Sequence, residues 1–135
     1  MSARLMSRIV IAAVAAVLAA GTAAGCFSEH VAPQSTGIDA RAICADPGSA
    51  AANVVIIKDF AFQPATVHIA AGQQVVWVNC ETTAGLGHTS TSDASGWNSG
   101  LIDPLASYSR TFASAGTFPY HCAIHPEMLA SVEVQ

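Results

Sequence analysis

Beyond residue 50, short apolar runs rich in β-branched residues alternate with turn residues to the end of the chain. The runs are NVVIIKDF, ATVHIA, QVVWVN, SYSRTFAS, TFPYHC and LASVEV. Within ATVHIA, Val67 and Ile69 alternate with polar neighbours, which is the period of two expected of a strand with one buried face. Glycines such as Gly72 and Gly116 mark turns between the runs. The pattern predicts an all-β domain over residues 51–135, built as a sandwich or a small barrel.

The first 25 residues follow a different pattern. Arg4 and Arg8 precede the apolar run IVIAAVAAVLAA, and small residues follow it. This run is too short to span a bilayer, which needs about 20 apolar residues. A basic start, a short apolar core and a small-residue cleavage region are instead features of a signal peptide. We therefore expect residues 1–25 to be a signal peptide, and the protein to be exported to the periplasm or the outer face of the cell membrane.

The segment AAGC, which ends at Cys26, resembles the lipobox of bacterial lipoproteins, where the chain is cut before a cysteine that is then lipidated. A Leu is commoner where Ala23 stands, and the alternative is simple cleavage that leaves Cys26 free or paired. Acyl chains on Cys26 would anchor the protein and provide its membrane contact. Residues 26–50 are rich in Pro, Gly, Ser and Ala and show no sustained apolar period, so we expect a flexible linker there.

Charge limits the choice of partners. Without residues 1–25 the basic side chains are Arg41, Lys58 and Arg110, against nine acidic ones, so the net charge changes from −4 to 3 − 9 = −6. So few cations cannot neutralise a run of phosphates, and nucleic acid is therefore excluded as an expected partner.

Four cysteines occur, and in an oxidising exported compartment each needs a role. Cys26 is accounted for by the lipobox, and Cys122 by the metal chemistry described next. Cys44 and Cys80 are left to form a disulfide, unless one or both stay free. Such a bridge would stabilise the fold by about 4 kcal/mol and would join the end of the linker to the domain.

The stretch FPYHCAIHPEM places Cys122, His125 and Met128 at the spacing C-x-x-H-x-x-M. Once the signal peptide is removed Met128 is the sole methionine, although a gap-filling core residue is the usual role of a Met. Thiolate, imidazole and thioether together favour copper over magnesium, calcium or manganese. No C-x-x-C pair of the kind typical of zinc sites occurs. Copper with one thiolate takes two imidazoles in a trigonal plane and a weak axial thioether, so one further His is required.

The remaining histidines differ in their surroundings. His30 lies in the predicted linker, and His68 lies on the polar side of an alternating strand, so both are expected at the surface. His121 adjoins Cys122 on a strand, where neighbouring side chains point to opposite faces. His88 follows the strand QVVWVN and a Gly-containing loop. We therefore expect His88, Cys122, His125 and Met128 to be the metal ligands.

This ordered pattern resembles the cupredoxins, the small blue copper proteins, over about residues 53–134. The resemblance rests on VVIIKDFAFQPATVHIAAGQQVVWVN before His88, on SGLIDPLASYSRTFASAGTFPYHCAIHPEM, and on the closing run ASVEV. The short Cys-to-Met loop, with Pro126 directly after the second His, is more similar to amicyanins than to plastocyanins. Within the family an Asn commonly follows the first ligand His, where Thr89 stands here, and an apolar residue commonly stands at the position of Glu127.

The resemblance implies a Greek-key β-sandwich with one type 1 copper ion, held by His88, Cys122 and His125 as strong ligands and by Met128 as the axial one. It also implies a monomeric electron carrier that is not an enzyme. Transient redox partners would dock near His125, within an apolar patch formed by Ala123, Ile124, Pro126 and Leu86.

Two alternatives use the same scaffold. The first is a copper-binding or delivery protein whose cargo is the metal. The second is an enzyme such as a multicopper oxidase or nitrite reductase, which needs further copper centres and an open coordination position that four ligands do not leave.

Overall fold

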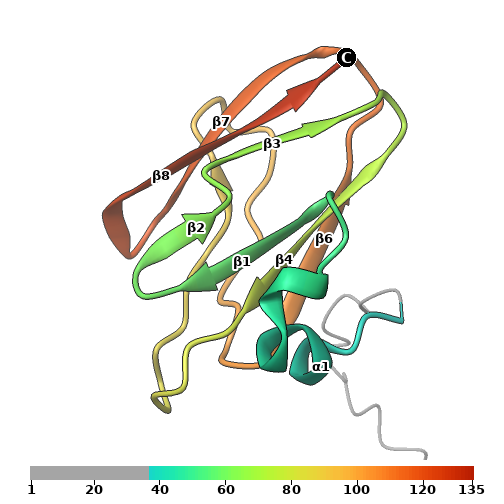
Figure 1. The fold of residues 1–135 in the computed structure, drawn as a ribbon. Helices are drawn as coiled ribbons and strands as arrows, with labels where there is room; N and C mark the ends of the chain where they lie inside the picture. Colours follow the sequence, from blue (N-terminus) through green and yellow to red (C-terminus); the bar gives the residue numbers. More distant parts are fainter. Residues whose placement is uncertain (1–36) are drawn as a thin grey trace, which may run out of the picture. The chain divides into compact units, whose positions relative to one another are not determined.

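The computed structural model of the protein describes residues 37–135. Its strands form two four-stranded sheets, ordered β2-β1-β4-β6 and β3-β8-β7-β5 (Figure 1). Most neighbours are antiparallel, whereas β1 pairs with β4 and β3 pairs with β8 in parallel. The architecture confirms the predicted all-β Greek-key sandwich. The strands are β1 Val54–Lys58, β2 Ala61–Gln63, β3 Thr66–Ile69, β4 Gln74–Asn79, β5 Thr91–Ser92, β6 Ser107–Thr111, β7 Gly116–Cys122 and β8 His125–Val134.

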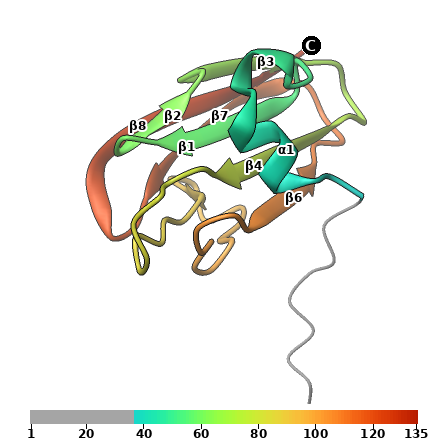
Figure 2. The same cartoon turned by 60° about the horizontal axis from the view of Figure 1, so that its bottom comes forward.

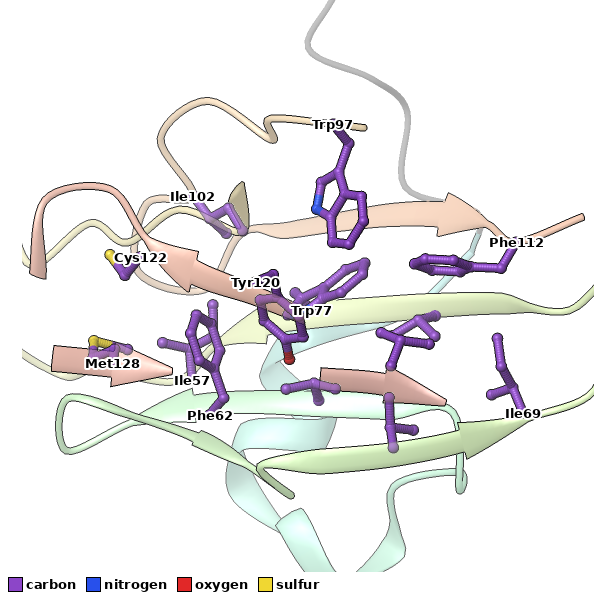
Figure 3. Close-up of a cluster of buried hydrophobic side chains, with 14 of the residues drawn as sticks. Ile57, Phe62, Ile69, Trp77, Trp97, Ile102, Phe112, Tyr120, Cys122 and Met128 are labelled. Carbon is purple, nitrogen blue, oxygen red and sulfur yellow. The ribbon is translucent and has the colours of Figure 1, made fainter. Parts of the chain in front are cut away.

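Aromatic side chains fill the space between the sheets (Figure 3). Trp77 is fully buried, and its ring centroid lies 5.5 Å from that of Tyr120 and 6.3 Å from that of Trp97. The guanidinium of Arg110 covers the Trp97 ring at 4.9 Å, a cation–π contact that closes this side of the core. Both tryptophans therefore serve packing, and a core this aromatic gives a small domain the rigidity that a metal site requires.

A second apolar cluster covers the outer face of the β1–β4 pair. Helix α1 (Ala40–Ala45) and the short 3₁₀ helix η1 (Pro47–Ser49) lie there, and Figure 2 shows α1 across β4. Asp39 caps α1 by accepting hydrogen bonds from the backbone N–H groups of Arg41 and Ala42. Both faces of β1 and β4 are consequently buried. The residues in this cluster are Ala40, Val54, Ile56, Val76, Val78 and Cys80, with Ile38, Ile43, Cys44 and Ala50 partly buried against them.

This helix changes the expected domain boundary. Residues 38–50, which the sequence assigns to the linker, are folded, because the apolar outer face of β1 and β4 needs a cover and Ile38 and Ile43 provide it. Residues 26–36 of the predicted linker, with the Cys26 that we expect to be lipidated, and the predicted signal peptide of residues 1–25 lie outside the described residues.

Cys44 and Cys80 form the predicted disulfide, with their Cα atoms 5.2 Å apart. The bridge joins the last turn of α1 to the residue that follows β4. Within residues 37–135 the remaining cysteine, Cys122, is free and buried.

The β1–β2 turn and the β7–β8 turn lie at the same end of the sandwich, as both views show (Figures 1 and 2). Cys122 ends β7 and His125 begins β8, so the C-x-x-H-x-x-M motif forms this end of the second sheet. No helix among the described residues has the length and apolar character needed to cross a membrane.

Removing the disulfide tests its contribution to stability. We expect the Cys44→Ala/Cys80→Ala variant to lose about 4 kcal/mol of unfolding free energy, because the bridge closes a long loop in the unfolded chain. Urea unfolding of the metal-free protein measures this. An unchanged midpoint would show that the packing of α1 holds this segment without the cross-link.

Candidate metal centre

Three metal-binding side chains converge at the end of the sandwich where the β7–β8 turn lies. The ligand atoms of His88, Cys122 and His125 all lie within 4.8 Å of one another. His88 and Cys122 are completely buried, whereas His125 is partly exposed. Residues separated by 34 and 37 positions in the chain therefore meet, and of the three donors only His125 reaches solvent.

The separations between these atoms fit one metal ion. Cys122 Sγ lies 3.8 Å from His88 Nδ1 and 3.7 Å from His125 Nδ1, and the two Nδ1 atoms are 3.1 Å apart. An ion with metal–nitrogen bonds of about 2.0 Å and metal–sulfur bonds of about 2.3 Å, set at trigonal or tetrahedral angles, requires donors roughly 3 to 4 Å apart. Two imidazoles and one thiol at these separations match the donor types and spacing of the trigonal set that copper takes in blue copper proteins.

Met128 completes the expected set from the core side. Its side chain is 2% exposed, and Figure 3 shows the sulfur atoms of Met128 and Cys122 at the same end of the core. Met128 alternates with exposed Glu127 and Leu129 on β8, so the strand register turns it inward. A thioether here suits the weak axial position.

The other histidines are engaged elsewhere. His121 points to the outer side of β7, where its Nδ1 bonds the carboxylate of Asp93. Exposed His68 pairs with Glu133 at 3.2 Å across the β3–β8 ladder. Both positions agree with the expectation that these two side chains lie away from the metal, while His30 lies outside the described residues.

Thr89, which stands where the family commonly has Asn, ties the two ligand segments together. Its hydroxyl accepts a hydrogen bond of 2.7 Å from the backbone N–H of Ala123, and its own N–H donates to Cys122 Sγ at 3.3 Å. The hydroxyl also lies 2.9 Å from that of Thr91. A β-branched alcohol therefore joins the His88 segment to the Cys122 loop despite its shorter reach, and an amide N–H stabilises negative charge on the sulfur.

Glu81 is a part of the site that the sequence did not reveal. This carboxylate is 7% exposed, and Oε1 lies 3.3 Å from Nε2 of His88 while accepting the N–H of Phe60 at 3.1 Å. Nδ1 faces the other donors, so a metal bound there would leave the proton on Nε2, where the carboxylate accepts it. Burial lowers the pKa of His88 from its usual 6.5 and repulsion from His125 adds to this, against the opposing effect of Glu81. His88 is therefore a neutral imidazole, ready to bind a metal at neutral pH.

Asn79 holds the loop that carries Glu81. Its buried side-chain amide donates to the carbonyl groups of Leu86 at 2.9 Å and Ile102 at 2.8 Å, and its Oδ1 accepts the N–H of Glu81 at 3.0 Å. Ile102 in turn exchanges two backbone hydrogen bonds with His88. These hydrogen bonds hold the backbone that carries the first imidazole.

Comparison with known proteins identifies the family. The sequence profile of the copper binding proteins of the plastocyanin/azurin family matches residues 49–135. This chain belongs to that family. Its cofactor is accordingly a copper ion, and the donor atoms gathered at the end of the sandwich fit that ion.

Among individual proteins, the chain is similar to amicyanin from Paracoccus denitrificans, with 31% identity over 123 residues that cover 90% of this chain and 91% of the relative. Among solved structures, it matches a reduced tryptophan-to-tyrosine variant of amicyanin with a TM-score of 0.56 and 27% identity, over 65% of this chain and 88% of that one. A purple cupredoxin from Nitrosopumilus maritimus shares the fold, with a TM-score of 0.54 and 23% identity over 61% of this chain and 98% of that one.

The tie made by Thr89 can be tested by an isosteric change. We expect Thr89→Val to lower the unfolding free energy of the metal-free protein by about 0.5–1.5 kcal/mol, because the Ala123 N–H loses its acceptor. Thr89→Ser keeps the hydroxyl and should retain most of that energy. If both variants unfold at the urea concentration of the wild type, the hydroxyl does not hold the loops together.

Glu81 offers a second test. We expect Glu81→Gln to weaken Cu(II) binding by about 10- to 100-fold and to raise the reduction potential, because the ligand His88 loses a charged hydrogen-bond partner that favours the more positive ion. Competition with a chelator and cyclic voltammetry measure the two effects. Glu133→Gln removes the same charge from a pair outside the site, and an equal response to both changes would assign the effect to net charge.

Proposed function

We propose that this protein is an exported blue copper protein that carries single electrons between redox partners through a mononuclear type 1 copper site. The proposed ligands are His88, Cys122 and His125 in the trigonal plane and Met128 on the axis. Membership of a copper-binding family supports the metal, and the convergence of one thiolate and two imidazoles at 3.1 to 3.8 Å is the observation that carries the proposal.

Copper bound by such a set supplies a one-electron couple, and the protein's part is to keep the donors still while the electron moves. The backbone bonds between His88 and Ile102, the Asn79 amide and the Thr89 tie fix the ligands from several directions. The buried positions of His88 and Cys122 keep water from becoming a further ligand. A site that changes little between oxidation states suits rapid transfer.

The position of His125 supports a role as the electron's route to the surface. Unlike the other two donors it is partly exposed, and Ile124 beside it is 52% exposed. A small apolar surface suits the brief docking of transient redox partners. The protein is proposed to act as a monomer, without catalytic activity of its own.

Export rests on the sequence of residues 1–25, and attachment to the membrane rests on the lipobox that ends at Cys26. We propose the periplasm or the outer face of the cell membrane as the location. Labelling with a fatty acid in the producing cell, with Cys26→Ala as the comparison, tests the anchor separately from the copper chemistry.

The visible spectrum of residues 27–135 with one equivalent of Cu(II) tests the function directly. We expect an intense blue absorption band that Cys122→Ser abolishes, together with reversible one-electron reduction. Absence of the band, with weak and exchangeable Cu(I) binding instead, would contradict electron transfer and favour copper delivery.

A further inference from the structure

Phe60 covers the two histidines from the outside. Its ring meets that of His125 edge to face with centroids 5.0 Å apart, and that of His88 in the same way at 5.6 Å. Yet 44% of Phe60 remains exposed, so one aromatic ring touches both imidazoles and solvent. A partner protein that reaches this end of the sandwich would meet Phe60 together with the partly exposed His125.

The turn that carries Phe60 is held in an unusual conformation. Asp59 and Phe60 both adopt left-handed backbone angles, with φ of 52° and 54°, between β1 and β2. A two-residue hairpin turn of type I′ has positive φ at both positions, which Asn and Gly usually occupy, so an Asp followed by a Phe is costly there. The N–H of Phe60 is bonded to Glu81, which also bonds His88. The turn and the first imidazole are therefore held by one carboxylate.

Two further exposed apolar residues lie beside the histidines. Ile124 lies next to His125 in sequence, and Leu101 contacts the backbone beside His88, since a Cβ built on Gly87 would lie 2.6 Å from Leu101 Cδ1. Leu101 is 60% exposed. Three large apolar side chains thus lie exposed around the ligands, which is typical of an interaction surface.

The charges beside this apolar surface are mostly negative. Three exposed carboxylates lie next to residues of this surface in the chain. Asp59 precedes Phe60, and Glu127 lies two residues after His125. Asp103 follows Ile102, whose backbone pairs with that of His88. The one basic side chain next to these residues in sequence is Lys58, which lines a neighbouring hollow of about 430 Å³ beside the Cys44–Cys80 disulfide.

We propose that the docking surface for the redox partner is centred on Phe60 and ringed by Asp59, Asp103 and Glu127. The partner it fits is an electron-transfer protein with an apolar contact surface and a rim of Lys and Arg. This inference rests on the proposed electron-transfer function and adds the chemistry of the partner. Such complementary charge speeds encounter and selects partners more than it adds affinity.

Two small oxidants of opposite charge can test this surface. The cationic one shares the positive charge and apolar surface of the proposed partner, and the anionic one is its counterpart. Tris(phenanthroline)cobalt(III) has a charge of about +3 and apolar ligands, and hexacyanoferrate(III) has a charge of about −3. Each takes one electron from the reduced protein, becoming cobalt(II) or iron(II), and no proton is transferred. Stopped-flow decay measured at low and high salt compares them, because the Debye length falls from about 30 Å at 0.01 M to about 10 Å at 0.1 M ionic strength.

We expect the cobalt reaction to slow and the hexacyanoferrate reaction to accelerate as salt rises. At low salt, Asp59→Asn/Glu127→Gln should slow the cobalt reaction by about two- to threefold for each charge removed, and should accelerate the hexacyanoferrate reaction. Asp59→Asn/Asp103→Asn should behave alike and leaves the ligand loop untouched.

The matched control is Asp39→Asn/Glu133→Gln. It removes the same number of charges from the N-cap of α1 and from a β8 position six residues beyond Glu127, roughly 20 Å along the strand. Equal effects of the test and control pairs, or rates indifferent to reagent charge, would overturn the docking inference while the blue spectrum kept the electron-transfer function. Loss of the blue spectrum in the wild type would instead refute the function on which the inference rests.

The apolar centre is tested at Phe60. Phe60→Ser should slow oxidation by the cobalt complex at high salt, where charge steering is screened, whereas Leu105→Ser, at a similarly exposed position on the β5–β6 connection, should not. A Phe60→Leu variant keeps an apolar side chain and should retain most of the rate. If Phe60→Ser reacts at the wild-type rate with its visible spectrum intact, Phe60 is not the point of contact.

Discussion

Two nitrogen atoms and one sulfur atom must remain close together at the end of this sandwich, and most features of the surrounding structure serve that constraint. The imidazoles are brought to 3.1 Å and the thiol to within 3.8 Å of each. Bringing these polar atoms together in a buried place does not by itself stabilise the fold, because each buried polar group loses its hydrogen bonds to water and needs a partner in the protein. The hydrogen bond from Ala123 to Thr89 and the backbone pairing of His88 with Ile102 hold the loops in this arrangement. The scaffold therefore keeps the three donor atoms at these separations. A bound metal ion would stabilise the same arrangement further.

The sequence predicted the fold and the donor set because both have short-range signals. Strand alternation identified the sandwich, and the spacing of Cys122, His125 and Met128 identified a soft metal site with one distant imidazole still required. The same alternation separated His121 from Cys122, and the structure places His121 on the outer side with Asp93. The strands, the motif and the orientation of His121 can be predicted because they depend on residues that are close in sequence. The choice of metal can be predicted because few other metal sites combine a thiolate, imidazoles and a thioether.

The parts that were missed depend on contacts between distant segments. Glu81 follows a strand end and has no motif, yet its carboxylate meets both His88 and the Phe60 turn. The segment 38–50 resembles a linker because it is short and rich in small residues. However, four consecutive residues of β1 are buried, so both faces of this strand are apolar and its outer side needs a cover. The run VVII in β1 contains no alternating polar residue, and from this pattern the cover could have been predicted.

The cover also connects the start of the folded domain to the metal centre. Cys44 in α1 is bonded to Cys80, and the next residue is Glu81, which accepts hydrogen bonds from His88 and from the turn of Phe60. Asn79, on the other side of Cys80, fixes the loops before His88 and after Ile102. Three consecutive residues thus join the outer helix, the first imidazole and the exposed aromatic ring. Because Glu81 is confined by the bridge on one side and by its partners on the other, its carboxylate needs little reorganisation when the charge beside His88 changes, as a low-barrier electron-transfer site requires.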